Sequence, residues 1–396
     1  MKAAITGLLL AASLGMSGVQ AQERVKIGIL GDQSGVYADA GGPGSVVAAQ
    51  IAIDEFRASH PGIPVSLVSA DHQNKPDVAL SIAGRWLDAE NVDMIADLQN
   101  SSVSLAVQKF AGDRNRITIT TSSVTPELYN AGCTATGIHW AMDAYALVAG
   151  PVRTLSARKR WFFITVDLAG GHLFEKAGMD AVRAHGDEVV GSARHPLGTA
   201  DMSSFLLAAQ ARGAQVIALA DAGTDAINAI KGASEFGLMA AGVAVTPLLF
   251  HVSDVKATGL QTTQGMVFGT NYYWDENDHT RRFAQAFFAR FNGMPTDYQA
   301  NVYTAVRHYL VAVAAAGTTD GAAVMKAMRD RPIELFSDRT GTLRADGRVV
   351  YDTDVVQVKA PNEAKGPWDL VKVIRTIPAE QAFPPLSESR CPLLKR

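Results

Sequence analysis

Cysteine is scarce in this sequence: only Cys133 and Cys391 occur among its 396 residues. The two lie too far apart for a CxxC motif, which excludes the redox and zinc motifs built on that spacing. An even count in an exported protein permits a disulfide, and the alternative is a pair of free thiols. We prefer the disulfide, which would tie the C-terminal tail to the first half of the chain.

Long apolar runs are missing after residue 21, where no stretch reaches 18 consecutive apolar residues. The mature protein therefore has no candidate transmembrane helix, and we expect it to be soluble. Residues 1–21 differ, because Lys2 precedes a mostly apolar or small stretch that ends in the small-residue site Val19-Gln20-Ala21. This order predicts a cleaved secretory signal peptide and a periplasmic protein, with an N-terminal membrane anchor as the alternative. No cysteine lies near the cleavage point, so a lipid would have no acceptor there.

An excess of positive charge is also absent. Removal of the signal peptide with its Lys2 leaves 35 basic and 39 acidic side chains, a net charge of −4. A protein with this charge balance lacks the excess of basic side chains that is typical of nucleic-acid binding. The short basic run at 158–160 precedes an apolar strand, and it is more typical of a solvated helix end than of a phosphate site. A hydrophobic content of 47% excludes wholesale disorder.

The common enzyme motifs are missing too: the chain has no GxGxxG, GxxxxGK[ST], GxSxG or HExxH. The glycine-rich segment 31–44 follows a strand and precedes a helix, as a dinucleotide loop would, but its spacing favours a wide turn made possible by glycine. The histidines lack metal-ligand spacing, and His139 beside Trp140 is typical of a packing histidine. We therefore expect no cofactor, no metal and no enzymatic activity, although a catalytic triad is spatial and leaves no fixed spacing.

What the sequence does contain is an alternation of short β-rich runs and amphipathic helical runs, in two successive series. This pattern predicts βα crossovers and parallel sheets, an α/β fold with two lobes of one architecture. The first series has strands at 25–30, 65–70, 94–97 and 117–121 and helices at 45–58, 77–88 and 103–111. The second, after a helix at 141–155, has strands at 161–166, 188–193, 215–220 and 244–250 and helices at 173–184, 203–212 and 225–236.

From residue 278 the sequence pattern becomes mainly helical, and helices are expected at 278–291, 298–315 and 321–328. Extended segments are expected at 341–343 and 348–359. We expect the chain to return to the first lobe and then cross again, a topology that suits a hinge. The expected division is 22–140 with about 275–336 for lobe 1, and 141–274 with about 337–375 for lobe 2. The proline-rich tail 376–396 should wrap the surface.

Candidate binding residues follow the strand ends, because ligands bind beyond the carboxyl ends of strands in open parallel sheets. The third strand is followed by Asn100, Ser101 and Ser102, and the fourth by Ser122 and Ser123. Hydroxyls and free N–H groups at a helix start bind a carboxylate well. The alternative is simple N-capping of the helices by Ser and Thr side chains.

The second lobe offers matching turns around Gly170, Asp221 and the segment 250–254. Asp221 could meet a ligand amine or hydroxyl, or it could orient its turn, while Asp225 could cap its helix. His251 could close over a bound solute. Tyr37 and Asp39 in the first glycine-rich loop could supply a stacking face and an acceptor, which completes the set of expected ligand-binding residues.

Several stretches together resemble the branched-chain amino-acid-binding protein family of ABC importers. They are residues 25–44, the turn at 100–102, the stretch 121–128 and the segment 222–237, in that order. The resemblance implies the type I periplasmic-binding fold, with two Rossmann-like lobes, a three-crossing hinge and ligand in the cleft. It also implies that Ser101 and Ser122 hold the ligand carboxylate.

The sequence departs from that family's pattern at two places. Val124 stands where a hydroxyl is usual, and Gly170 falls at or near the position of a usual aromatic residue. An absent aromatic side chain would open room in the cleft. This weakens the case for a simple aliphatic amino acid and favours a bulkier or aromatic carboxylate, or an amide.

The resemblance implies a periplasmic solute-binding protein, expected to be monomeric, that closes over a small molecule and delivers it to an ABC permease at the inner membrane. Two alternatives stay open. The same lobes could present ligand state to a sensor, or the chain could be a periplasmic enzyme. No nucleic-acid partner is expected.

Overall fold

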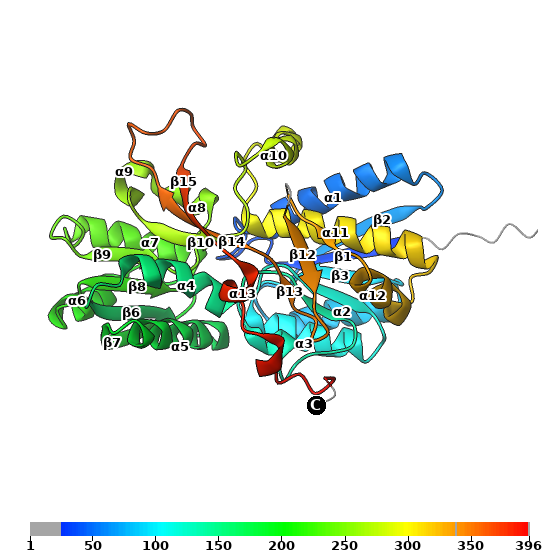
Figure 1. Ribbon diagram of the computed structural model, residues 1–396, viewed down its shortest axis with the longest axis horizontal. Coiled ribbons are helices and arrows are strands. Elements are labelled where there is room, and N and C mark those ends of the chain that lie inside the picture. Colours follow the sequence, from blue (N-terminus) through cyan, green and yellow to red (C-terminus); the bar gives the residue numbers. More distant parts are fainter. Residues whose placement is uncertain (1–24, 337–338, 395–396) are drawn as a thin grey trace, which may run out of the picture.

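Two parallel β-sheets form the centres of two lobes that lie side by side in the computed structural model (Figure 1). The structure describes residues 25–336 and 339–394, so the expected signal peptide lies outside the described residues. The first sheet has the order β2-β1-β3-β4-β5, and the second has the order β7-β6-β8-β9. The first contains β1 (Val25–Gly31), β2 (Val65–Asp71), β3 (Met94–Asp97), β4 (Ile117–Thr120) and β5 (Gly137–His139). The second contains β6 (Arg160–Val166), β7 (Glu188–His195), β8 (Val216–Ala220) and β9 (Ala244–Pro247).

Both faces of the first sheet are covered by helices, as a parallel sheet requires. Along β1, Ile27 and Ile29 face one apolar core and Leu30 faces another, and all three are fully buried. Gly28 leaves room for the indole of Trp86, because a Cβ there would lie 2.6 Å from the Trp86 ring. The covering helices are α1 (Gly42–Ser59), α2 (Pro76–Asp88), α3 (Ser101–Gly112), α10 (Asp278–Phe291), α11 (Asp297–Ala316) and α12 (Gly321–Arg329).

The second lobe repeats this arrangement. Phe163 of β6 faces one core, and its neighbours Phe162 and Ile164 face the other. A three-stranded antiparallel sheet, β10-β14-β15, extends this lobe. The helices are α4 (Ala144–Leu155), α5 (Ala169–Ala184), α6 (Ser203–Ala211), α7 (Gly223–Glu235), α8 (Val252–Thr258) and α9 (Leu260–Thr263); the added strands are β10 (Val267–Thr270), β14 (Thr353–Val358) and β15 (Val371–Ile377).

The third crossing between the lobes differs from the sequence-based expectation. Three short strands, β11 (Ile333–Glu334), β12 (Thr340–Leu343) and β13 (Val349–Val350), form one small antiparallel sheet. Arg348 beside β13 also pairs with His139 at the edge of the first sheet. Residues 340–350 therefore belong to lobe 1, and the chain crosses between β13 and β14 instead of near residue 337.

Buried polar contacts join the first and third crossings. Arg348 is fully buried and donates hydrogen bonds to the carbonyls of His139, at 3.3 Å, and Ala141. The Tyr351 hydroxyl donates to the carbonyl of Trp140 at 2.6 Å. Buried donors must find acceptors, so these bonds fix the two crossing segments against each other.

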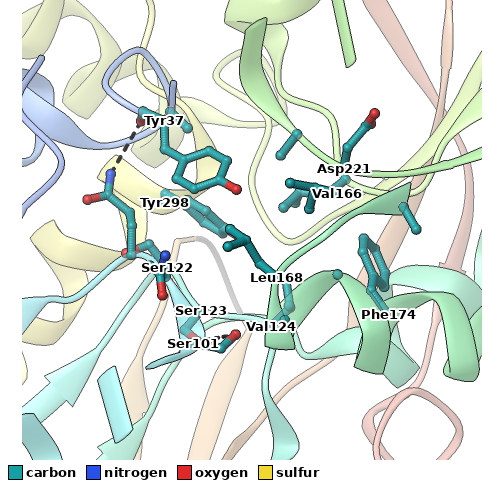
Figure 2. A pocket seen from close by; sticks show the side chains of 18 of the residues that line it. Tyr37, Ser101, Ser122, Ser123, Val124, Val166, Leu168, Phe174, Asp221 and Tyr298 are labelled. Atoms are coloured by element: carbon teal, nitrogen blue, oxygen red, sulfur yellow. Dashed lines mark hydrogen bonds between the residues drawn. The ribbon is translucent and has the colours of Figure 1, made fainter. Parts of the chain in front are cut away.

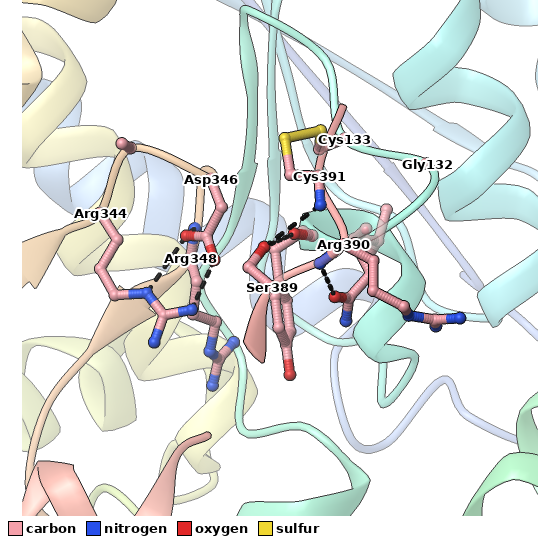
Figure 3. The surroundings of a disulfide bond; sticks show 12 residues. Gly132, Cys133, Arg344, Asp346, Arg348, Ser389, Arg390 and Cys391 are labelled. Carbon is pink, nitrogen blue, oxygen red and sulfur yellow. Dashed lines mark hydrogen bonds and ion pairs between the residues drawn. A yellow bond between two sulfur atoms is a disulfide. The ribbon is translucent and has the colours of Figure 1, made fainter. Parts of the chain in front are cut away.

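The C-terminal tail leaves lobe 2 after β15 and returns to lobe 1. It contains α13 (Ala379–Ala382) and the 3₁₀ turn η2 (Leu386–Glu388), and it ends beside the 3₁₀ turn η1 (Pro126–Tyr129). Cys391 forms a disulfide with Cys133, the pairing preferred from the sequence (Figure 3). The Ser389 hydroxyl donates to the carbonyl of Tyr129 at 3.0 Å. The tail is thus a fourth connection between the lobes.

Candidate functional site

A cavity of about 630 Å³, part of it open to solvent, lies between the two lobes at the carboxyl ends of their parallel strands (Figure 2). Both lobes supply its wall, so it changes shape with any movement of one lobe against the other. The wall consists of Tyr37, Ala40, Gln99, Asn100, Ser101, Ser122, Ser123, Val124 and Tyr298 from the first lobe, and Val166, Leu168, Gly170, Gly171, Phe174, Ala220, Asp221, Ala222, Leu249 and His251 from the second.

The first-lobe wall is rich in hydroxyls because β3 and β4 are neighbours and both end there. Asn100 has a φ of 72°, a left-handed conformation that asparagine tolerates better than most residues. Its side chain caps α3 by accepting from the N–H groups of Ser102 and Val103. The capping role expected of this turn thus falls to Asn100, and Ser101 is left to face the cavity.

The serine hydroxyls form a chain along this wall. Ser104 lies behind it, with its hydroxyl 3.0 Å from the Ser101 carbonyl and 3.1 Å from the Ser123 hydroxyl, and the Ser123 hydroxyl lies 3.4 Å from that of Ser101. When Ser123 donates to Ser101, the Ser101 proton is left to point into the cavity. Figure 2 shows Ser101 and Ser123 close together at one end of the site.

Ser122 plays a different part from the one expected. Its hydroxyl donates to the carboxylate of Asp97 at 2.6 Å and also lies 3.0 Å from the Asp97 carbonyl. The hydroxyl proton is therefore used inside lobe 1, although the residue lines the cavity. Burial raises the pKa of Asp97 to about 6, and the Ser122 hydrogen bond counteracts part of that rise.

Helix α5 begins at the same end of the cavity from the opposite lobe. No side chain caps its N-terminus, where Leu168 precedes Ala169 and Gly170. The first N–H groups of such a helix have no partner within the helix and carry a partial positive charge. The site thus brings two helix N-termini, those of α3 and α5, to one point.

The expectation that Gly170 opens room in the cavity is wrong. A Cβ at Gly170 would lie 2.6 Å from the Ser101 hydroxyl oxygen and 3.8 Å from a methyl carbon of Val124. The space is filled by the first lobe, so the missing side chain permits close approach of the two lobes. An aromatic face is supplied one helical turn later by Phe174, which the sequence analysis did not single out.

The second-lobe wall is mainly apolar. Val166 is the last residue of β6 and Leu168 lies just beyond it, and both are seen with Phe174 in Figure 2. Leu249 adds to this apolar part of the wall. Val166 and Leu168 could have been predicted as cavity residues from the sequence, since they lie at a strand end as the serines do. Phe174 could have been found from its spacing of four residues from Gly170 on a helix face.

Two tyrosines of the first lobe border the apolar surface. Tyr37 and Tyr298 point into the cavity from segments far apart in the sequence (Figure 2). Burial raises the pKa of the Tyr37 hydroxyl, and the nearby carboxylates of Asp225 and Asp221 raise it further. Both hydroxyls are therefore neutral hydrogen-bonding groups. Nothing in the local sequence of Tyr298 indicates this role.

Asp221 is paired within its own lobe. Its carboxylate lies 3.3 Å from His195 Nε2, and in Figure 2 it points away from Leu168 and Phe174. Burial raises the pKa of Asp221 to about 6, although the hydrogen bond to His195 opposes the rise. Asp225 accepts from the N–H of Gly198 at 3.0 Å instead of capping α7, whose N-cap is Ala222.

His251 is the N-cap of α8 and reaches across to the other lobe. Its Nδ1 lies 2.5 Å from the carboxylate of Asp297, the first residue of α11, and both side chains are buried. Burial lowers the pKa of His251, but the Asp297 carboxylate more than offsets this, so the pKa is raised overall.

The structure brings eight of the ten expected ligand-binding residues into the cavity wall and leaves out Asp39 and Ser102, which are exposed. Ser102 follows Ser101 on α3, and a rotation of about 100° per residue turns it away from the cavity. Asp39 contributes only its carbonyl, which accepts from Gln299.

Among the described residues, no group of three or more His, Cys, Asp or Glu side chains could hold a metal ion. None of the helices of this part of the chain is long and apolar enough to cross a membrane.

Comparison with known proteins places this geometry in a family. Residues 24–366 match the family model described as periplasmic binding protein. A periplasmic binding protein from Burkholderia mallei is 41% identical, with 94% of this chain and 99% of that chain covered and a TM-score of 0.90. A branched chain amino acid ABC transporter periplasmic ligand-binding protein from Burkholderia xenovorans LB400 is 40% identical, with 93% and 100% covered and a TM-score of 0.83. An R. palustris solute-binding protein in complex with 4-hydroxybenzoate is 19% identical, with 92% and 100% covered and a TM-score of 0.80, and shares the fold. The chain belongs to the periplasmic binding protein family.

Proposed function

We propose that this protein is the solute-binding component of an ABC importer, and that it captures a small carboxylate with an apolar body between its lobes. One observation carries the proposal. The cavity has serine hydroxyls and two helix N-termini at one end, and Val166, Leu168, Phe174 and Leu249 along the opposite wall.

A carboxylate fits the polar end for electrostatic reasons. No Arg or Lys lines the cavity among the described residues, so the attraction has to come from N–H groups and hydroxyls. Ser101 and Gly170 lie at the starts of α3 and α5, which both carry partial positive charge. The N–H groups of Ser102 and Val103 already donate to Asn100. Helix α3 would therefore contribute mainly its dipole and the Ser101 hydroxyl, and the uncapped α5 its N–H groups. An anion between the two helix starts would be attracted by both lobes at once.

Closure follows from that shared attraction. A solute shifts a two-state equilibrium only through its different affinity for the two states. A carboxylate held by α3 alone would not distinguish open from closed lobes, but one that also meets α5 would favour closure. Closure also removes water from Phe174 and Leu249, so an apolar body adds to the preference.

A second candidate solute is an α-amino acid, because one oxygen of the buried Asp221 carboxylate has no described hydrogen-bond partner. That oxygen could accept from an ammonium group. The Burkholderia xenovorans relative is named for branched-chain amino acids, which supports the candidate. Against it stands the pairing of the other Asp221 oxygen with His195.

The remaining parts of the proposal follow from the family. The protein is exported to the periplasm, acts as a monomer without catalysing a reaction, and presents its closed form to a membrane permease. The residue match to the periplasmic binding protein family supports this role.

Calorimetric titration with matched pairs of solutes tests the proposal. The pairs are L-leucine with 4-methylpentanoate and L-phenylalanine with 3-phenylpropanoate, together with benzoate and benzamide. We expect the acids without an amine to bind at least as tightly as the amino acids, and benzamide to bind weakly. Binding of the amino acids alone would establish the second candidate, and binding of no carboxylate would overturn the proposed solute class.

A further inference from the structure

His251 stands at a junction of the two lobes and the cavity. It begins α8, where its N–H donates to the carboxylate of Asp254 at 2.9 Å. This hydrogen bond holds the backbone of His251 at the start of α8. The ring is fully buried and forms part of the cavity wall.

One ring nitrogen is committed to the other lobe. The distance from Nδ1 to the Asp297 carboxylate is 2.5 Å, and Asp297 belongs to α11 of lobe 1. Tyr298, the next residue of α11, packs the edge of its ring on the imidazole, with ring centres 4.7 Å apart. Because the partners belong to different lobes, we expect these contacts to be lost when the lobes separate.

The other ring nitrogen, Nε2, is buried and has no hydrogen-bond partner among the described residues. A buried polar atom without a partner costs free energy, so a ligand that supplies one is favoured. The carboxylate accepts from Nδ1–H, which leaves Nε2 of the neutral ring as an acceptor and makes it a donor only when the ring is protonated.

We propose that His251 is a specificity-determining residue that latches the lobes through Asp297 and offers Nε2 to a second polar group of the solute. This inference rests on the proposed function, since it assumes that the solute occupies the cavity. It narrows the solute to a carboxylate that carries a hydroxyl, carbonyl or similar group in addition to its apolar body.

The pairing with Asp297 gives the latch a direction of pH dependence. The charged and titratable groups that face His251 are Asp297 and Tyr298 on α11 and Asp254 on α8, with Asp39 facing Asp254. In the closed form burial lowers the pKa of His251, and Asp297 raises it further than burial lowers it. An open cleft would return the ring toward its ordinary pKa of about 6.5. The closed form therefore binds the proton more tightly, and closure should strengthen as the pH falls from above the raised pKa toward that ordinary value.

The first experiment measures affinity as a function of pH. Benzoate and its three monohydroxy derivatives are titrated into the wild type, Asp297→Asn, His251→Gln and the double variant between about pH 8 and pH 6. Asp330→Asn is the matched control, because Asp330 and Lys326 form an exposed pair at 2.5 Å at the end of α12 in lobe 1, and neither residue lines the cavity. We expect wild-type and control affinities to rise as the pH falls, and the rise to be smaller in Asp297→Asn, where only the buried carboxyl groups of Asp97 and Asp221, common to all the proteins, still change protonation.

The same titrations separate the two parts of the proposal. For benzoate, which has no group for Nε2, each single variant should bind roughly tenfold more weakly at about pH 6, and the double variant no more weakly than either, because both remove one shared contact. At least one hydroxybenzoate should bind the wild type more tightly than benzoate, and His251→Gln should lose that gain. Additive losses, or a pH profile of Asp297→Asn that matches the control, would overturn the latch. Equal binding of all four acids by the wild type would overturn the contact at Nε2.

A second experiment needs no solute. A Cβ on Gly170 would lie 3.3 Å from the Cβ of Ser101, close to the spacing of a disulfide, so Ser101→Cys with Gly170→Cys can be cross-linked only in the closed form. Equilibration against glutathione at fixed pH reports the closed population. Asp297→Asn should shift this equilibrium toward the reduced form, and Asp330→Asn should not. If no carboxylate binds but this shift occurs, the solute class fails and the latch stands, whereas the same equilibrium in both variants overturns the latch.

Discussion

Gly170 and Ser101 are in contact across the closed cleft, with the start of one lobe's helix against the start of the other's. A side chain at position 170 would meet the Ser101 hydroxyl oxygen at 2.6 Å. This is shorter than any ordinary contact, so the Ser101 hydroxyl would have to rotate away or the lobes would have to separate, and the Ser101 Cβ at 3.3 Å leaves little slack. Unless positions 101 and 170 are joined by a covalent bond, the absence of a side chain at 170 therefore favours this closed contact.

Replacement of Gly170 tests that relationship. Gly170→Val should weaken solute affinity at least tenfold and Gly170→Ala by less, because the bulkier side chain holds the lobes further apart. The thermal midpoint of the solute-free protein should change little, since the contact belongs to the closed form. Titration and small-angle scattering with saturating solute measure both effects. Gly366→Ala is the control, because no atom lies within 4 Å of a Cβ there. Unchanged affinity in Gly170→Val would show that the lobes do not meet at this point.

Ser101 and Ser122 should respond differently to replacement by alanine. Ser101→Ala removes a hydroxyl that faces the cavity, so affinity should fall about five- to tenfold with little loss of stability. Ser122→Ala removes the donor to the buried Asp97, so stability should fall by about 1–3 kcal/mol. Urea denaturation and calorimetric titration of both variants separate the two losses. If instead Ser122→Ala lost affinity and Ser101→Ala lost stability, the Ser122 hydroxyl would be the group that donates to the solute carboxylate.

Asp97 predicts a pH dependence of stability. Its folded pKa of about 6 is raised from an ordinary value of 3.8, so the folded protein holds a proton that the unfolded chain has released between these values. Stability should therefore fall as the pH rises from about 4 to about 6, by roughly 3 kcal/mol for two pKa units.

Asp97→Asn should abolish that loss, and asparagine also tolerates the φ of 82° at this position. The free energy of unfolding of both proteins at pH 4, 5, 6 and 7 measures the difference. A constant gap between wild type and variant over this range would contradict the assignment.

The disulfide should contribute to stability and not to recognition. Cys133→Ser with Cys391→Ser should lower the free energy of unfolding by about 2–4 kcal/mol, because the bond closes a loop of 258 residues in the unfolded chain. A reductant should lower the stability of the wild type and leave the double variant unchanged. Two free thiols in freshly isolated, denatured wild-type protein would refute the pairing.

Much of the fold was predictable because local patterns carried it. The strand at 94–97 was expected with the bounds that the structure gives, and the helix expected at 278–291 likewise matches α10. Short apolar runs between amphipathic helices leave few other architectures. The edge strands β5, β10 and β15 were missed, since short or irregular edge strands have weak alternation.

The candidate site was predictable only in part. Ser101, Ser122 and Ser123 could be predicted to line the cavity because each follows a strand of the parallel sheet, and the carboxyl ends of such strands meet at one edge. The partnership of His251 with Asp297 was not predictable, since 46 residues separate them and neither has a local signature. The packing of Gly170 on Ser101 depends on how far the lobes close, which no local pattern encodes.

The return of the tail to lobe 1 has a consequence for incomplete chains. Lobe 1 begins with β1, but its disulfide cannot form until Cys391 has been synthesised. A polypeptide that stops before this residue leaves Cys133 without its partner and the surface beside η1 without Ser389. Chains truncated before Cys391 should therefore be distinguishable from chains that contain it by one reactive thiol, at Cys133.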